Sequence, residues 1–177
     1  MRIMVPFAEG FEEIEALTIV DVLRRAGITV DMIGVVGSMI TGAHGVKVVM
    51  DKRLNAVRAE DYEGIVLPGG SPGYINLSKS NALKEMIKQM NSKGKLVAAI
   101  CASPAVLAKA GVLDNRHATI YPGMEKELPY PRDERVVVDG NVVTSQGPGT
   151  ALEFALKIVE LLKGSGEAAK LRRALLL

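Results

Sequence analysis

A short apolar run that ends in the only cysteine of the chain constrains the fold more than any other feature. Residues 96–100 are all apolar, which is typical of a buried strand, and a helical pattern begins about three residues after Cys101. A side chain at such a sharp turn lies in a nucleophile elbow, where the crowded backbone needs small neighbours such as Ala99, Ala102 and Ser103. The sequence therefore predicts a nucleophile elbow at Cys101.

The reactivity of Cys101 has two interpretations. Backbone N–H groups at the start of the following helix would favour the thiolate over the thiol, which is typical of a reactive cysteine. Alternatively, Cys101 is an inert core residue, because free cysteines are usually buried and unreactive. The strand-turn-helix context favours the reactive interpretation.

The rest of the chain alternates between strand and helix patterns. Strands are expected at 2–7, 28–36, 64–68, 96–100, 118–121, 135–138 and 142–144. Residues 42–50 alternate and could form a hairpin partner or an edge strand. Helices are expected at 11–26, 78–91, from the elbow to about 110, 151–163 and at the C-terminal end. This order predicts an α/β fold with a doubly wound, mostly parallel sheet and helices on both faces.

Four segments follow predicted strands at the carboxyl edge of the sheet, where such folds bind ligands. They are 8–15, 67–70, Cys101 and 145–150. The amides of Gly69 and Gly70, together with that of Ala102, could line an oxyanion pocket that faces Cys101. The glycines could instead form only a tight turn, and Gly147 and Pro148 could be a plain loop or a close approach of backbone to the site.

Three glutamates open the first predicted helix. Glu12 and Glu13 are expected to be solvated, because the helix dipole favours acidic residues there. Glu15 is expected near the apolar stripe, beside Ile14 and Leu17. Burial next to a thiolate would raise the pKa of Glu15 and make it a proton donor or shuttle.

Composition excludes several classes of protein. The chain has 177 residues, 48% hydrophobic and 24% charged, with a net charge of +2, so we expect one globular domain over 1–177 with no nucleic-acid or membrane partner. One cysteine allows no internal disulfide, and the N-terminus becomes polar too early for a signal peptide, which favours a cytoplasmic location. His44 and His117 have no metal-ligand spacing, and we expect both to be isolated.

Together these motifs resemble the ThiJ/PfpI superfamily, in particular the branch of the parkinsonism-associated protein deglycase and its bacterial relatives. The resemblance covers nearly the whole chain and is carried by AEGFEEIEA, PGG, AAICASP and TSQGPGTALEFAL. It implies a flavodoxin-like fold, a homodimer and no cofactor. It also implies that Cys101 is the nucleophile, that a protonated Glu15 hydrogen-bonds it, and that Gly69, Gly70 and Ala102 are backbone donors.

The chain departs from the superfamily pattern at two positions. Several members have a histidine where this chain has Tyr121, so a histidine acid is not expected and Tyr121 is a candidate for the rim of the site. The protease-like branch has a histidine where this chain has Ala102, which argues against an intracellular cysteine peptidase.

The resemblance to this superfamily implies two alternative hypotheses of function. In the first, the protein is a cysteine-dependent enzyme of the glyoxalase III or protein deglycase type, in stress protection. It would act on methylglyoxal-like 2-oxoaldehydes or their adducts on proteins, without a metal or other cofactor. In the second, oxidation of Cys101 makes the dimer a redox-sensing chaperone.

Overall fold

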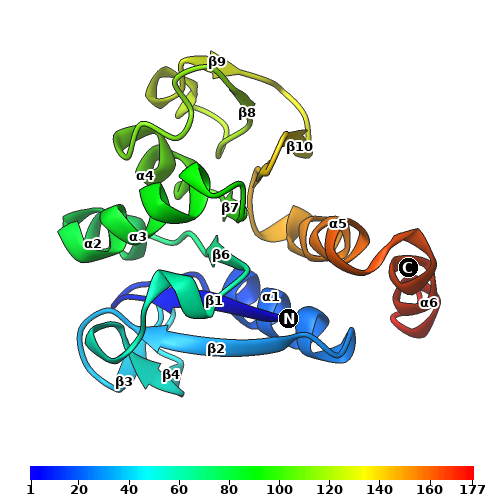
Figure 1. Cartoon of the computed structure of the whole chain (residues 1–177), viewed down its shortest axis with the longest axis horizontal. Helices are drawn as coiled ribbons and strands as arrows, with labels where there is room; N and C mark the ends of the chain where they lie inside the picture. Colours follow the sequence, from blue (N-terminus) through cyan, green and yellow to red (C-terminus); the bar gives the residue numbers. More distant parts are fainter.

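A seven-stranded sheet with helices on both faces makes up most of the computed structural model, which describes residues 1–177 (Figure 1). The strand order is β10-β11-β7-β6-β1-β2-β5. All neighbouring strands pair in parallel except the hairpin of β10 and β11. The sheet strands are β1 (Arg2–Phe7), β2 (Thr29–Gly34), β5 (Lys52–Arg53), β6 (Gly64–Leu67), β7 (Leu96–Ile100), β10 (Val136–Asp139) and β11 (Val142–Ser145). The expected flavodoxin-like doubly wound fold is confirmed.

The helices cover the two faces of the sheet as separate layers. They are α1 (Glu13–Arg25), α2 (Gly73–Lys79), α3 (Asn81–Ser92), α4 (Pro104–Lys109), α5 (Ala151–Lys163) and α6 (Ser165–Ala174). In Figure 1, α1 (blue) and α5 (orange) lie on one face, and the green helices α2, α3 and α4 lie on the other. Single 3-10 turns occur at Leu54–Ala56, Ala59–Asp61, Glu125–Glu127 and Pro148–Thr150. None of the helices combines the length and apolar character that crossing a bilayer needs.

Strand β7 shows why the buried strands of the sheet are continuous apolar runs in the sequence. Ala98 and Ile100 pack with α1 and α5, whereas Val97 and Ala99 pack on the opposite side with α3 and α4. Because successive side chains point to opposite faces, a strand covered on both sides needs apolar residues at every position. The elbow residue Cys101 thus follows a strand that is fixed from both faces.

The helix expected over 78–91 forms as α3, but it starts later, at Asn81, because residues 78–79 belong to the preceding helix α2. Ser80 ends α2 and caps α3, where its hydroxyl accepts a hydrogen bond from the Leu83 amide at 3.2 Å. A cap at Ser80 was one of the two expected. The sequence did not predict helix α2, because Pro72 and Gly73 at its start are residues typical of a loop. Its first turn is docked on the loop after β1 through the Gly73 amide, which donates to the Gly10 carbonyl at 3.1 Å.

The expected strand over 118–121 was also wrong. Only a two-residue strand, β8 (His117–Ala118), forms, and it pairs with β9 (Tyr130–Pro131) outside the main sheet. The residues that follow form hydrogen bonds to other segments instead of to a paired strand. The Thr119 amide donates to the Thr144 hydroxyl at 2.9 Å, and the Tyr121 amide donates to the Cys101 carbonyl at 2.8 Å. These bonds draw the segment across the elbow.

The segment 42–50 is a hairpin partner, one of the two expected outcomes. Its strand β4 (Lys47–Val49) has three residues and pairs antiparallel with β3 (Met39–Thr41).

Helix α1 buries only the later part of the apolar stripe that its sequence predicts. Val20, Val22 and Leu23 are buried, whereas Ile14 and Leu17 are 59% and 38% exposed, so the prediction for the first turn was wrong. The helix buries small and branched residues further along, together with two carboxylates at its start: Glu13, Glu15, Ala16, Ile19, Val20, Val22 and Leu23.

Candidate active site

Cys101 lies at the turn between β7 and α4 in a conformation that non-glycine residues rarely adopt. Its φ is 63°, which costs about 1–3 kcal/mol unless the surroundings hold it. The Cys101 amide donates to the Ser145 carbonyl at 3.0 Å, and the Ser103 hydroxyl donates to the Pro68 carbonyl at 2.5 Å. Neighbouring strand ends therefore fix the turn, and the nucleophile elbow expected at Cys101 is present.

Glu15 enters the site from the first turn of α1. Its side chain is fully buried, and one carboxyl oxygen, Oε2, accepts a hydrogen bond from the Gly69 amide at 2.7 Å. The other oxygen, Oε1, is buried without a nitrogen or oxygen partner. Burial, more than any other cause, raises the pKa of Glu15 to about 7, while the Gly69 amide and Cys101 lower it. The carboxyl group can thus gain or lose a proton near neutral pH, as expected for a shuttle.

Gly69 separates the two reactive side chains. A Cβ at this position would lie 2.5 Å from the Cys101 Cβ and 2.8 Å from the Glu15 Oε2. No side chain fits there, so glycine allows the thiol and the carboxyl to approach each other. The Gly69 amide is directed at Glu15, whereas the sequence suggested an oxyanion pocket facing Cys101.

The amides of Gly70 and Ala102 lie on the Cys101 side of the site, where they lower the pKa of the thiol. Gly70 has a φ of 95°, and a Cβ there would lie 2.3 Å from the Glu12 nitrogen. The turn after β6 therefore needs glycine both for its backbone conformation and for its contact with the loop after β1.

The thiol itself is harder to ionise than the sequence suggested. Burial first, and the charge of Glu15 second, raise the pKa of Cys101 to about 12, while the Gly70 and Ala102 amides lower it. The expected preference for thiolate was wrong for the state in which Glu15 is ionised, because two negative charges would then be buried side by side. When Glu15 is protonated this repulsion disappears, so the two groups titrate as a coupled pair that shares a proton.

A pocket of about 530 Å³ opens above the sulfur. Its lining residues come from five loops: Glu12, Gly70, Ser71, Tyr74, Cys101, Ala102, Tyr121, Pro122, Gly123, Met124 and Pro148. Tyr121 and Pro148 lie at the rim as expected. Gly147 does not line the pocket, but a Cβ at Gly147 would lie 3.4 Å from the Tyr121 ring, so it supports that rim. The sequence did not indicate Ser71 or Tyr74, because α2 was not recognised.

Glu13 is not solvated as expected but lies buried under the β3–β4 loop. Its carboxylate accepts hydrogen bonds from the His44 amide at 2.7 Å and from the Val46 amide at 3.4 Å, and it contacts the His44 ring at 2.9 Å. Glu12 was also expected to be solvated, and its side chain is only 12% exposed.

Neither histidine is isolated, although both are exposed. His44 faces Glu13, and His117 lies 3.4 Å from Asp139. Glu12, Glu13 and His44 are close enough to share a metal ion, but both Glu13 oxygens already accept hydrogen bonds from the loop. These hydrogen bonds indicate that the cluster serves to hold the β3–β4 loop against the start of α1.

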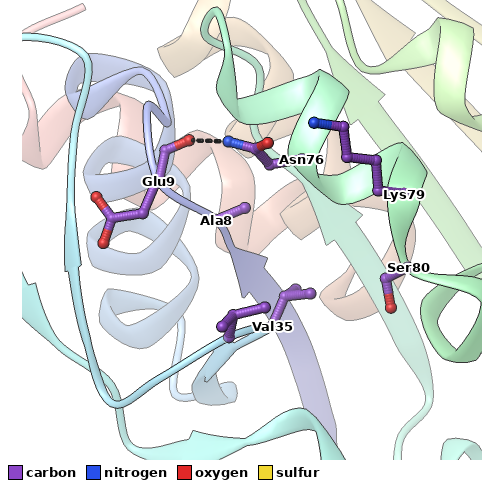
Figure 2. A pocket seen from close by; sticks show the side chains of 7 residues that line it. Ala8, Glu9, Val35, Asn76, Lys79 and Ser80 are labelled. Atoms are coloured by element: carbon purple, nitrogen blue, oxygen red, sulfur yellow. Dashed lines mark hydrogen bonds between the residues drawn. The ribbon is translucent and has the colours of Figure 1, made fainter.

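A second pocket, of about 430 Å³, is formed by the loops after β1 and β2 together with α2 (Figure 2). It is lined by Ala8, Glu9, Val35, Val36, Asn76, Lys79 and Ser80. The Asn76 side chain donates to the Glu9 carbonyl at 2.9 Å across its floor. Neither Cys101 nor Glu15 lines this pocket, so it is separate from the reactive pair.

Known proteins are similar to this chain in sequence and structure over nearly its whole length. The model of the DJ-1/PfpI family matches residues 1–161. The Drosophila melanogaster protein dj-1beta is 41% identical over 178 residues, which cover 98% of this chain and 95% of that protein. A Caenorhabditis elegans protein named glutathione-independent glyoxalase DJR-1.2 is 38% identical over 172 residues, covering 96% and 92%. The solved structure of oxidized Toxoplasma gondii DJ-1 has a TM-score of 0.96 and 42% identity, covering 99% and 97%.

Proposed function

This chain belongs to the DJ-1/PfpI family, and we propose that it is a cysteine-dependent, cofactor-independent glyoxalase acting on methylglyoxal-like 2-oxoaldehydes. The observation that carries the proposal is the buried pair of Cys101 and Glu15. A nucleophile at a strained elbow faces a carboxyl group whose pKa of about 7 suits both proton donation and proton acceptance. A related C. elegans protein that bears the name of such an enzyme supports the same reaction.

The first step forms a covalent hemithioacetal. The Cys101 thiolate attacks the aldehyde carbon of methylglyoxal, a C–S bond forms, and the carbonyl electron pair moves to the oxygen. The Gly70 and Ala102 amides, which lower the pKa of Cys101 in the free protein, would stabilise this oxyanion. Protonated Glu15 then supplies the proton that makes it a hydroxyl.

The second step moves hydrogen from the aldehyde carbon to the neighbouring ketone carbon. Ionised Glu15 removes the proton from the sulfur-bearing carbon to give an enediolate, and the proton of the C1 hydroxyl moves to the former ketone oxygen. Glu15 then returns its proton to the adjacent carbon, which gives a thioester of lactate. Water then attacks the thioester carbon, the C–S bond breaks, and lactate leaves. The net reaction adds one water to methylglyoxal and regenerates the Cys101–Glu15 pair.

Early adducts of methylglyoxal on proteins fit the same chemistry. In these adducts the aldehyde carbon carries an amine and a hydroxyl. Attack by Cys101 would break the C–N bond, release the protonated amine and give the same hemithioacetal. The protein would then also act as a deglycase.

Redox sensing by Cys101 is the second candidate function. A solved relative from Toxoplasma gondii is in an oxidized form, and Cys101 is partly accessible from a pocket. Amides that stabilise an oxyanion would equally stabilise a sulfinate. A peptidase is disfavoured because Ala102 stands where a histidine base would be needed.

Turnover of methylglyoxal to lactate without added thiol tests the proposal. We expect the wild type to form lactate and Cys101→Ser to form none. Absence of turnover in freshly reduced wild type would refute the enzyme proposal. Intact-mass measurement after peroxide treatment tests the sensor, which is refuted if Cys101 gains no oxygen at a dose that leaves the methionines unchanged.

A further inference from the structure

The pocket above Cys101 carries a negative charge and no positive one. Glu12 is its only charged lining residue at neutral pH, and no lysine or arginine lines it. Apart from Ser71, the remaining wall is mostly apolar and aromatic, with Tyr74, Tyr121 and Met124 among its residues. An apolar wall focuses the field of a nearby charge into the pocket instead of screening it.

Two contacts hold Glu12 in place. Its amide donates to the Gly69 carbonyl at 3.0 Å, which ties it to the turn that contacts both reactive side chains. One carboxylate oxygen, Oε1, accepts a hydrogen bond from the Ile14 amide at 3.3 Å and caps α1. The charge therefore belongs to the site and is not carried on a free surface side chain.

Neighbouring charges do not cancel Glu12. The nearest basic group is the exposed His44 ring, whose Nδ1 lies 3.7 Å from Glu12 Oε2 and 2.9 Å from Glu13 Oε2. One imidazolium faces two carboxylates, so the cluster remains negative even when His44 is protonated. The charge of Glu12 also raises the pKa of Glu15, which means that its field reaches the reacting groups.

We propose that Glu12 makes the Cys101 pocket charge-selective, so that it admits neutral 2-oxoaldehydes and repels those that carry a carboxylate or phosphate. The inference rests on the proposed glyoxalase function. In that reaction the charge of Glu12 would act on the product as well as on the choice of substrate. The reaction converts a neutral substrate into a 2-hydroxy acid, which is an anion at neutral pH. Glu12 would therefore repel the product but not the substrate, and so favour product release.

Alkylation of Cys101 tests this selectivity without requiring turnover. Iodoacetamide is neutral and iodoacetate is an anion of similar size, and both react with the same thiolate. After correction for their rates with N-acetylcysteine, we expect iodoacetate to react about tenfold more slowly than iodoacetamide at low salt. The ratio should approach one as salt screens the charge.

Two variants assign the effect to Glu12. Glu12→Gln keeps an oxygen that can cap Ile14 and should bring the two corrected rates several-fold closer, and the charge of Glu15 beside Cys101 accounts for any difference that is left. Glu9→Gln removes a charge from the same loop, but Glu9 lines the second pocket (Figure 2), so this control should keep the wild-type ratio. Equal corrected rates in the wild type, or an unchanged ratio in Glu12→Gln, would overturn the proposal even if the protein turns over methylglyoxal.

Product inhibition extends the test to the catalytic cycle. Lactate should inhibit the wild type several-fold more weakly than the neutral lactamide, and Glu12→Gln should remove this difference. If lactate binds as well as lactamide in the wild type, Glu12 does not act on product release. If no turnover occurs at all, the glyoxalase proposal fails, and the alkylation ratios still decide whether Glu12 selects by charge.

Discussion

Replacement of Glu15 by glutamine separates the two roles that we assign to this residue. Glu15→Gln nearly preserves size and shape, and its amide oxygen can still accept the hydrogen bond from Gly69 that now measures 2.7 Å. The variant removes the negative charge, which is the second largest cause of the raised pKa of Cys101. It also removes the only buried group beside Cys101 that can take up and return a proton.

The two losses act in opposite directions on two measurable rates. We expect alkylation of Cys101 by iodoacetamide at pH 8 to become faster, because at that pH most of the wild-type Glu15 is ionised and opposes the thiolate. Lactate formation from methylglyoxal should fall by about 10²–10⁴-fold, the usual contribution of a positioned acid or base. Circular dichroism controls for folding. A variant with faster alkylation and turnover within tenfold of wild type would refute the assignment of proton transfer to Glu15.

Three further predictions follow from the same geometry. Burial raises the pKa of Glu15 above its usual value, so the folded state binds the proton more tightly than the unfolded chain. Stability from this group is therefore present below about pH 4.5 and is lost as the pH rises through about 7, a loss of about 3 kcal/mol. Thermal unfolding should show a smaller decrease over this range in Glu15→Gln, and an equal decrease would contradict the raised pKa. Gly69→Ala should reduce turnover at least tenfold and cost about 1–3 kcal/mol of stability, since its Cβ would lie 2.5 Å from that of Cys101. The matched control Gly149→Ala has open space around the new Cβ and should change neither, and equal effects would exclude the steric explanation. Tyr121→Phe should keep turnover within tenfold, because Tyr121 is a half-exposed rim residue; a larger loss would make its hydroxyl a proton donor.

Periodicity and turn residues were sufficient to predict the fold and the elbow. Buried parallel strands are continuous apolar runs, and the small residues Ala99, Ala102 and Ser103 around Cys101 indicate a crowded backbone at its turn. The burial of Glu15 was also expected, although for an incorrect reason. Its apolar neighbours Ile14 and Leu17 are exposed, and the carboxyl is buried by tertiary contact with Gly69 and Cys101.

The remaining errors share one physical origin, which is contact between segments far apart in the chain. Nothing local indicates that Glu13 is buried, because its partners are amides of the β3–β4 loop some thirty residues away. The helix over Gly73–Lys79 lacks a side-chain cap at its start and is held instead by the Gly10 carbonyl. Burial and the charge of Glu15, which lies on another helix, raise the pKa of Cys101 by more than the amide of Ala102 at the local helix start lowers it.

Covalent capture of the substrate tests the central claim most directly. Wild-type protein mixed with excess methylglyoxal and quenched in acid within its turnover time should carry one added methylglyoxal mass on the peptide that contains Cys101. The adduct should disappear as methylglyoxal is consumed and lactate appears. Lactate formation with no adduct at Cys101, or undiminished lactate formation by Cys101→Ser, would contradict the account.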